Sequence, residues 1–200
     1  MYSKLRTIIC ITGADGSGKS TLVRALKKKW PHAHEVSIWD MLENTQVQVF
    51  SNKKDIDEYL CQLNADARLL FLAHAMEAAI DRALQSDSDI ILINAYYYKY
   101  FASELAMGAD KVLEDFLALR MPAPDKVIFL SHPPELNAAR KKRFSKYECG
   151  CREATYQNFI NFQQRSVLQL EKYIKPEWCV LNAALEPEEL CALALKSITE

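Results

Sequence analysis

The chain has 200 residues, half of them hydrophobic, which is enough for one domain with a substantial core. Its 25 basic and 26 acidic side chains give a formal net charge of −1, so the general basic excess of a protein that binds nucleic acid or an anionic membrane is missing. The six cysteines are scattered, and the apolar runs are too short for a signal peptide or a membrane span. We expect a cytoplasmic protein with reduced thiols.

The first half of the chain predicts two strands and two helical stretches. Residues 5–12 are apolar and rich in isoleucine, which is typical of a parallel strand buried on both faces. A glycine-containing loop, residues 13–18, separates this strand from helical periodicity at residues 20–30. Residues 35–39 predict a short second strand, and residues 56–85 predict one long helical stretch.

The second half repeats this alternation of short apolar strands and helices. Further strands are predicted at residues 90–93, 126–130 and 178–181. Further helices are predicted to start at the pair Pro133 and Pro134 and to cover residues 153–174 and 187–197. The alternation predicts an α/β fold, with a five-stranded parallel sheet covered by helices on both faces, in a single domain over residues 1–200.

Residues 13–20 read Gly-Ala-Asp-Gly-Ser-Gly-Lys-Ser and match the phosphate-binding P-loop pattern completely. Glycines there let backbone N–H groups turn toward a triphosphate, and the following helix presents its positive end to the same charge. Lys19 is predicted to reach the β- and γ-phosphates, and Ser20 to bind Mg²⁺. We therefore expect a P-loop NTPase fold with ATP and Mg²⁺ as cofactors, bound by Gly13, Asp15, Gly16, Ser17, Gly18, Lys19, Ser20 and Thr21.

A basic run follows the fourth predicted strand. It places five positive charges in seven residues, at Arg140, Lys141, Lys142, Arg143 and Lys146. Positive groups that close over a transferring phosphoryl group stabilise its charge and exclude water. The run therefore predicts a basic lid at about residues 140–152, with Arg140 and Arg143 acting beside Lys19. A solvated basic helix end is the alternative interpretation.

Several segments together resemble the thymidylate kinase family of nucleoside monophosphate kinases. Residues 13–22 are similar to that family's phosphate loop, including the aspartate at position 15. The sequence Leu-Leu-Phe-Leu-Ala at residues 69–73 resembles the helix whose phenylalanine stacks on the acceptor base. Residues 129–135, with the basic run after them, resemble the family's strand, proline pair and lid.

The resemblance implies an activity and roles for individual residues. It implies transfer of the ATP γ-phosphoryl group to a nucleoside monophosphate, with dTMP to dTDP as the best single expectation. Asp15 would orient the acceptor or the metal, and Phe71 would stack on the acceptor base. The family also implies a homodimer. The expected partner is a small nucleotide or nucleoside, with no nucleic acid and no membrane.

The chain departs from the family at the acceptor side. An aspartate–arginine pair ends the family's third strand, whereas Asn94 and Ala95 stand here, and Asn94 is the candidate acceptor-binding residue at this position. Tyr96 and Tyr100 belong to an aromatic cluster that predicts a wall against a planar acceptor, with ordinary packing as the alternative.

Two further functions stay open at this stage. Asp40 follows the second strand at the side where ligands bind in α/β sheets, and it is a candidate base for a nucleoside or small alcohol. The same aspartate is also a candidate helix N-cap. The other alternative is a nucleotide-binding protein that has lost catalysis, because Asn94 and Ala95 replace the aspartate–arginine pair of the family.

Overall fold

A computed structural model describes residues 6–39 and 50–199 of the chain. In these ranges five strands form one sheet in the order β2-β3-β1-β4-β5, and every neighbouring pair is parallel. The strands are β1 (Thr7–Gly13), β2 (His34–Val36), β3 (Ile90–Asn94), β4 (Lys126–Ser131) and β5 (Cys179–Asn182). The helices are α1 (Lys19–Lys29), α3 (Lys53–Leu60), α4 (Ala65–Leu84), α5 (Tyr97–Ala106), α6 (Lys111–Ala118), α7 (Pro134–Ala139), α8 (Tyr156–Leu170) and α9 (Pro187–Thr199), with short 3-10 turns η1 (Tyr147–Cys149) and η2 (Glu171–Tyr173).

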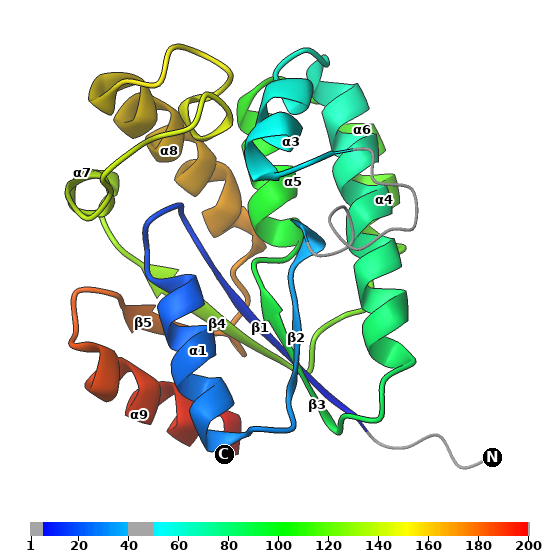
Figure 1. The fold of residues 1–200 in the computed structure, drawn as a ribbon, viewed down its shortest axis with the longest axis vertical. Helices are drawn as coiled ribbons and strands as arrows, with labels where there is room; N and C mark the ends of the chain where they lie inside the picture. Colours follow the sequence, from blue (N-terminus) through cyan, green and yellow to red (C-terminus); the bar gives the residue numbers. More distant parts are fainter. Residues whose placement is uncertain (1–5, 40–49, 200) are drawn as a thin grey trace.

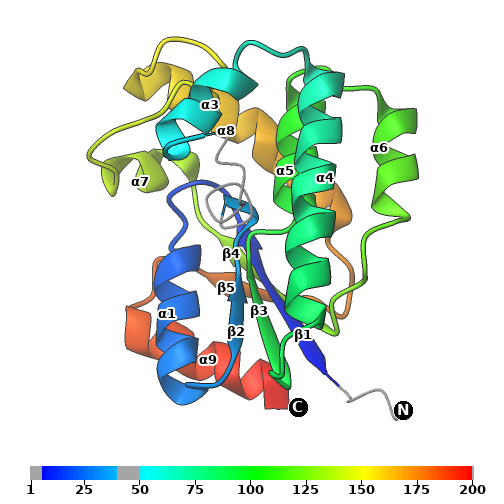
Figure 2. The same cartoon turned by 45° about the vertical axis from the view of Figure 1, so that its right-hand side comes forward.

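The central strand β1 has helices packed against both of its faces. Ile9 and Ile11 belong to the core under α1 and α9, whereas Cys10 belongs to the core under α4 and α5. Successive side chains of a strand point to opposite faces, so a strand buried on both sides is apolar throughout. Figure 1 and Figure 2 show the two helical layers on either side of the sheet. The predicted five-stranded parallel sheet with helices on both faces is confirmed.

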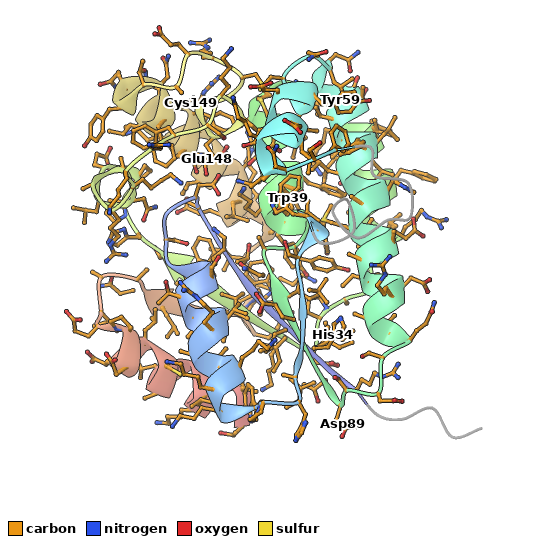
Figure 3. All side chains as sticks on the ribbon, viewed as in Figure 1. His34, Trp39, Tyr59, Asp89, Glu148 and Cys149 are labelled. Carbon is orange, nitrogen blue, oxygen red and sulfur yellow. The ribbon has the colours of Figure 1, made fainter. Side chains whose placement is uncertain are left out.

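The strand order determines where a ligand site can form. Because β3 and β4 flank β1 on opposite sides, the loop after β1 leaves the middle of the sheet at its carboxyl edge. Figure 3 shows Trp39 and Glu148 toward this edge, and His34 and Asp89 toward the opposite end of the strands. Open α/β sheets bind ligands in the crevice outside the carboxyl ends of their strands.

The prediction of a single long helix at residues 56–85 is wrong, because one helix ends at Leu60 and the next begins at Ala65. Each piece has its own asparagine cap. The Asn52 side chain accepts hydrogen bonds from the backbone N–H groups of Lys54 and Asp55, and the Asn64 side chain accepts one from Ala67. An asparagine side chain that satisfies free N–H groups starts a new helix, and apolar periodicity alone does not detect it.

Other boundaries also differ from the prediction. β2 ends at Val36 rather than at Trp39, because the chain turns into helix at residues 38–39 and the Ser37 hydroxyl accepts a hydrogen bond from the Trp39 N–H. Helix α5 was not predicted, since its tyrosines have only moderate helix propensity. It forms because it packs between α4 and α8. None of the helices in the described ranges combines the length and apolar character needed to cross a membrane.

A buried ion pair joins the helices behind the carboxyl edge. The Arg68 guanidinium of α4 donates to Glu104 Oε2 of α5 at 2.7 Å, and the Tyr147 hydroxyl donates to Glu104 Oε1 at 2.8 Å. Arg68 also donates to the carbonyl oxygens of Leu60 and Leu63, just after α3. All three polar side chains of this network are buried. The network therefore connects α3, α4, α5 and η1.

We expect Glu104→Ala to lower the free energy of unfolding by about 3 to 5 kcal/mol, because it leaves the Arg68 charge buried without its partner. Urea denaturation followed by circular dichroism measures this loss. Glu77→Ala is the matched control, since the Glu77–Arg120 pair lies at the surface, where removal costs less than about 1 kcal/mol. Equal losses in the two variants would contradict the role given to the buried pair.

Candidate functional site

The loop between β1 and α1 makes two close backbone contacts that only glycine permits. A Cβ atom at Gly13 would lie 2.6 Å from the carbonyl oxygen of Leu130, and one at Gly16 would lie 2.9 Å from the carbonyl oxygen of Asn137. Both glycines have positive φ, 147° and 83°. A side chain at either position would push the loop away from β4 or α7. The glycines therefore determine the shape of the loop.

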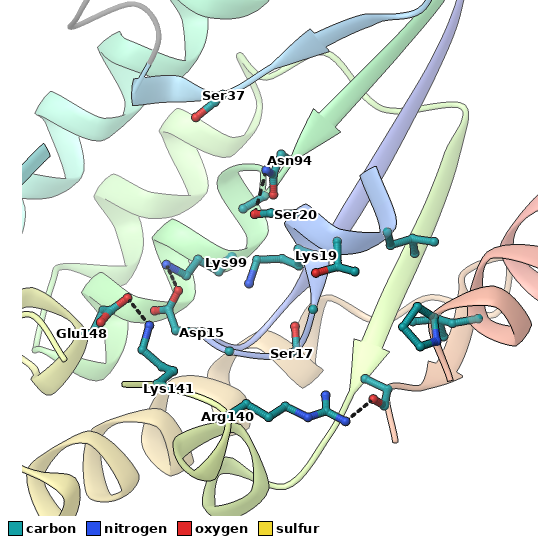
Figure 4. A pocket seen from close by; sticks show the side chains of 18 of the residues that line it. Asp15, Ser17, Lys19, Ser20, Ser37, Asn94, Lys99, Arg140, Lys141 and Glu148 are labelled. Carbon is teal, nitrogen blue, oxygen red and sulfur yellow. Dashed lines mark hydrogen bonds and ion pairs between the residues drawn. The ribbon is translucent and has the colours of Figure 1, made fainter. Parts of the chain in front are cut away.

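This loop borders a cavity of about 780 Å³ at the carboxyl edge of the sheet. Segments that follow all five strands contribute to its walls, as expected for a site at the carboxyl ends of parallel strands. The residues predicted to bind ATP line it from Asp15 to Thr21, while Gly13 lies behind the loop against β4. Figure 4 shows the side chains of Asp15, Ser17, Lys19 and Ser20 around the cavity. The structure thus brings the predicted phosphate-binding residues together.

The loop has the groups needed to hold an anion. The Ser17 hydroxyl is buried, and it has no hydrogen-bond partner among the described residues. No atom lies within 4 Å of where a Cβ would stand at Gly18, just before the N-terminus of α1. An unused donor and open space at a positive helix end fit a triphosphate.

Lys19 lies at the first position of α1 and its ammonium group turns back into the loop. Nζ donates to the carbonyl oxygens of Gly13 at 3.0 Å and of Ala14 at 2.6 Å. Burial has the largest effect on the pKa of Lys19 and lowers it from 10.5 to about 8. The Asp15 carboxylate acts in the opposite direction. An incoming phosphate would give this buried charge a better partner than backbone carbonyls.

The Ser20 hydroxyl, which Asn94 orients, suits a divalent cation. The Asn94 side chain at the end of β3 donates to Ser20 Oγ at 3.1 Å, as Figure 4 shows. A hydroxyl is a hard neutral ligand, and Mg²⁺ commonly combines one or two such ligands with waters and phosphate oxygens. The donor set therefore fits Mg²⁺ bound together with a nucleotide.

Asp15 is ionised and held in place by two other elements. Its Oδ1 lies 3.0 Å from Lys99 Nζ of α5, and its backbone N–H donates to Gln163 of α8 at 3.1 Å. Burial would raise the pKa of the Asp15 carboxyl, but the nearby ammonium groups of Lys99 and Lys19 bring it well below its usual range. A carboxylate with so low a pKa can orient a hydroxyl or a cation, but it is a weak proton acceptor.

The predicted lid, residues 140–152, lines the cavity with Arg140, Lys141, Tyr147 and Glu148. Arg140 and Lys141 line the cavity, and Arg143 is exposed outside it. Arg140 donates to the carbonyl oxygen of Ala183 at 3.0 Å, beyond the end of β5. Lys141 forms an ion pair with Glu148 of η1 at 3.0 Å. The geometry therefore places Arg140 and Lys141 at the cavity and does not place Arg143 there.

The residues predicted to bind the acceptor are divided in the structure. Asn94 and Tyr100 line the cavity, and Trp39 packs edge-on against Tyr100 with ring centroids 5.8 Å apart. Tyr96 is 1% exposed, and its hydroxyl donates to the Pro122 carbonyl oxygen. The prediction that Tyr96 forms part of a ligand-binding wall is therefore wrong, and the residue packs in the core. Phe71 packs against Phe50 and Tyr59 rather than along the cavity. Asp40 lies outside the described residues.

Several cavity residues were missed by the sequence reasoning. Lys53 at the start of α3 and Glu148 in η1 had no motif to mark them. Gln163, which holds the Asp15 backbone from behind the cavity, lies in mid-helix and was missed as well. Residues 183–187, in contrast, follow the last predicted strand. The rule that ligands bind at the carboxyl ends of strands would have found this segment.

Known proteins similar to this chain agree on one family. The family model for thymidylate kinase matches residues 11–193. A "Probable thymidylate kinase 1" of Saccharolobus solfataricus is 26% identical over 209 residues, which cover 97% of each chain. A "Probable thymidylate kinase" of Pyrobaculum aerophilum is 23% identical over 92% of each chain.

Solved structures show the same fold. A thymidylate kinase from Candida albicans superposes with a TM-score of 0.73 and 16% identity, over 97% of this chain and 91% of that one. A deoxyadenosine kinase from M. mycoides superposes with a TM-score of 0.66 and 15% identity, over 96% and 99% of the two chains. At these identities the superpositions establish the arrangement of strands and helices.

We expect the affinity for ATP to fall above pH 8, because only the charged form of Lys19 attracts phosphate and its pKa is about 8 in the free protein. The loss should approach about tenfold per pH unit beyond that value. Calorimetric titration with ATP and Mg²⁺ between pH 7.5 and 9.5 measures it. Lys19→Met is the control, which should bind weakly with little pH dependence; a flat profile for the wild type would contradict this role of Lys19.

Proposed function

The chain belongs to the thymidylate kinase family, and we propose that it transfers the γ-phosphoryl group of ATP to a nucleoside monophosphate. dTMP is the first candidate acceptor, because both curated relatives are thymidylate kinases by name. The observation that carries the proposal is the cavity that joins a complete phosphate loop to basic side chains from α7. That combination suits phosphoryl transfer, which depends on positioning and charge stabilisation.

The donor phosphates would bind along the loop after β1. The backbone N–H groups of the loop and Lys19 would hold the β- and γ-phosphates, and Arg140 and Lys141 would approach from α7. Ser20, with its hydroxyl oriented by Asn94, would hold Mg²⁺, which when bound neutralises charge on the phosphates. Gln163 ties the loop to the lid, because it also donates to the Glu148 carbonyl oxygen at 3.0 Å.

The acceptor would occupy the half of the cavity between β3 and α3. Trp39 and Tyr100 offer aromatic surface there, and Asp15 offers an ionised carboxylate. Because Asp15 is held ionised by Lys99, we assign it an orienting role rather than that of a base. Arg143 would take part only if the lid moved, since it lies outside the cavity.

The decisive experiment is an acceptor panel. We expect Mg²⁺-dependent ADP release from ATP with dTMP or another nucleoside monophosphate, and a loss of about 100-fold or more in Lys19→Ala, because the charge on the transferring group loses its partner. A coupled ADP assay over monophosphates, nucleosides and small alcohols measures this. Lys142→Ala is the matched control, because Lys142 is exposed and lies outside the cavity.

The other outcomes of the panel point elsewhere. Turnover only with an unphosphorylated acceptor would favour the nucleoside or alcohol kinase with Asp40 as base. ATP binding without turnover on any acceptor would favour the reading in which catalysis is lost. Lys19→Ala with wild-type activity would overturn a P-loop kinase altogether.

We further propose that the protein forms a homodimer and that α6 takes part in the interface. Val112, Phe116 and Leu119 are 77%, 62% and 88% exposed. Their spacing of four and three residues puts them on one side of the helix, so they form a continuous apolar stripe. Such a stripe is typical of a surface that another protein covers. The cytoplasmic location expected from the sequence stays a prediction.

We expect Phe116→Glu to shift the protein from dimer to monomer, because a charge in an apolar interface loses its hydration. Size-exclusion chromatography with light scattering at micromolar concentration measures the mass. Leu193→Glu is the control, since Leu193 is 39% exposed on α9, which packs with α1 on the other face of the sheet. A monomeric wild type would contradict the homodimer, and a dimeric Phe116→Glu would exclude this stripe.

A further inference from the structure

Five basic side chains from the described residues line the cavity, and they differ in how near a carboxylate lies to each positive charge. They are Lys19, Lys53, Lys99, Arg140 and Lys141. Two of them pair with carboxylates at 3.0 Å, Lys99 with Asp15 and Lys141 with Glu148. A lysine that already pairs with a carboxylate at this distance contributes little to the binding of a second anion.

The remaining three occupy different parts of the cavity. Lys19 contacts the phosphate loop itself, and Arg140 contacts Ala183 beyond β5. Lys53 lies at the start of α3, near the end of β2. Because β2 and β5 are the two edges of the sheet with β1 between them, Arg140 and Lys53 mark opposite ends of the cavity. The end that holds Lys53 also holds Tyr100 and Trp39.

Lys53 has the weakest ion pair of the cavity lysines. Its Nζ lies 3.9 Å from Asp57 Oδ2, at the outer limit for such a pair, and its side chain is 50% exposed. Burial raises the pKa of the Asp57 carboxyl, and the Lys53 charge acts in the opposite direction. A half-exposed lysine with a flexible stem can turn to an anion that enters beside it.

Lys53 is also positioned next to the aromatic wall. Its Nζ lies 5.8 Å from the centroid of the Trp39 ring, and Trp39 contacts Tyr100 edge-on. A molecule that combines a planar ring with a phosphate would meet aromatic surface and a positive charge together at this end. A neutral nucleoside would use only the aromatic surface.

We propose that Lys53 binds the phosphate group of the acceptor, and that it makes the site prefer a nucleoside monophosphate over the corresponding nucleoside. This inference rests on the proposed function, because it names the group that recognises the acceptor of that reaction. An ammonium group makes a compact point contact rather than the two-pronged contact of an arginine, so recognition depends on the charge of the acceptor more than on the orientation of its phosphate.

The test compares dTMP with thymidine as acceptors, with ATP as donor. We expect Lys53→Ala to lower kcat/KM for dTMP by at least about tenfold, because one charged hydrogen bond to phosphate is lost. The KM for ATP and any activity on thymidine should stay close to the wild-type values. Lys53→Arg should restore most of the dTMP activity, because it keeps the charge.

Lys54→Ala is the matched control. Lys54 is the next residue of the same helix, pairs with Glu58 at the surface and does not line the cavity. It should leave all three kinetic parameters unchanged. Circular dichroism melting of both variants separates a folding defect from a binding defect, and a Lys53→Gln variant repeats the test if Lys53→Ala unfolds.

Failure of the inference and failure of the proposed function give different results. A wild type that phosphorylates dTMP, together with an equally active Lys53→Ala, would overturn the role of Lys53 and leave the kinase function intact. A parallel loss on dTMP and thymidine would also overturn it, since the phosphate would not be the group recognised. A wild type with no activity on any monophosphate would overturn the proposed function and the inference with it.

Discussion

The turn between β1 and α1 leaves no room for side chains at two glycines, and the rest of the site is arranged around this close packing. Gly13 lies against the backbone of β4, and Gly16 lies against the backbone of α7 at Asn137. Helix α7 ends just before Arg140, so the contact at Gly16 also places Arg140 and Lys141 beside the phosphate loop. The same packing that shapes the loop therefore positions the first positive groups of the lid.

The second feature of the site is a set of ion pairs that compensate charged groups removed from water. Charged groups removed from water are tolerated when an opposite charge and hydrogen bonds compensate them. Three ion pairs at or behind the carboxyl edge join separate segments of the chain: Asp15 of the phosphate loop with Lys99 of α5, Lys141 with Glu148 of η1, and Arg68 of α4 with Glu104 of α5. These pairs hold the loop, the lid and the helices in one arrangement before any nucleotide enters. Such preorganisation reduces the reorganisation needed in phosphoryl transfer.

The parallel sheet gives the cavity two ends with different chemistry. The β5 end combines Arg140 with a short segment before α9, and the β2 end combines Trp39, Tyr100 and Lys53. The phosphate loop lies between them, because β1 is the central strand. Two nucleotides can therefore approach one transferring phosphoryl group from opposite sides, as a nucleoside monophosphate kinase requires.

Local features of the sequence determined the phosphate loop and the α/β fold. The loop is one continuous run in which residue types, spacing and neighbouring strand and helix agree, so Gly13 to Thr21 could be assigned without tertiary information. Strands buried on both faces also have a local signature, because every residue must be apolar. The break between α3 and α4 was missed because a side-chain cap at Asn64 overrode the apolar periodicity.

Which other side chains reach the cavity depends on how the helices pack on the sheet. Lys53 and Glu148 come from different elements, and no motif in the sequence distinguishes them from other charged residues. The sequence also does not distinguish Tyr96 from Tyr100, which belong to one cluster of tyrosines. Tyr96 packs in the core, whereas Tyr100 lines the cavity. Residue type and spacing specify contacts within a segment, whereas contacts between segments depend on how helices pack on the sheet.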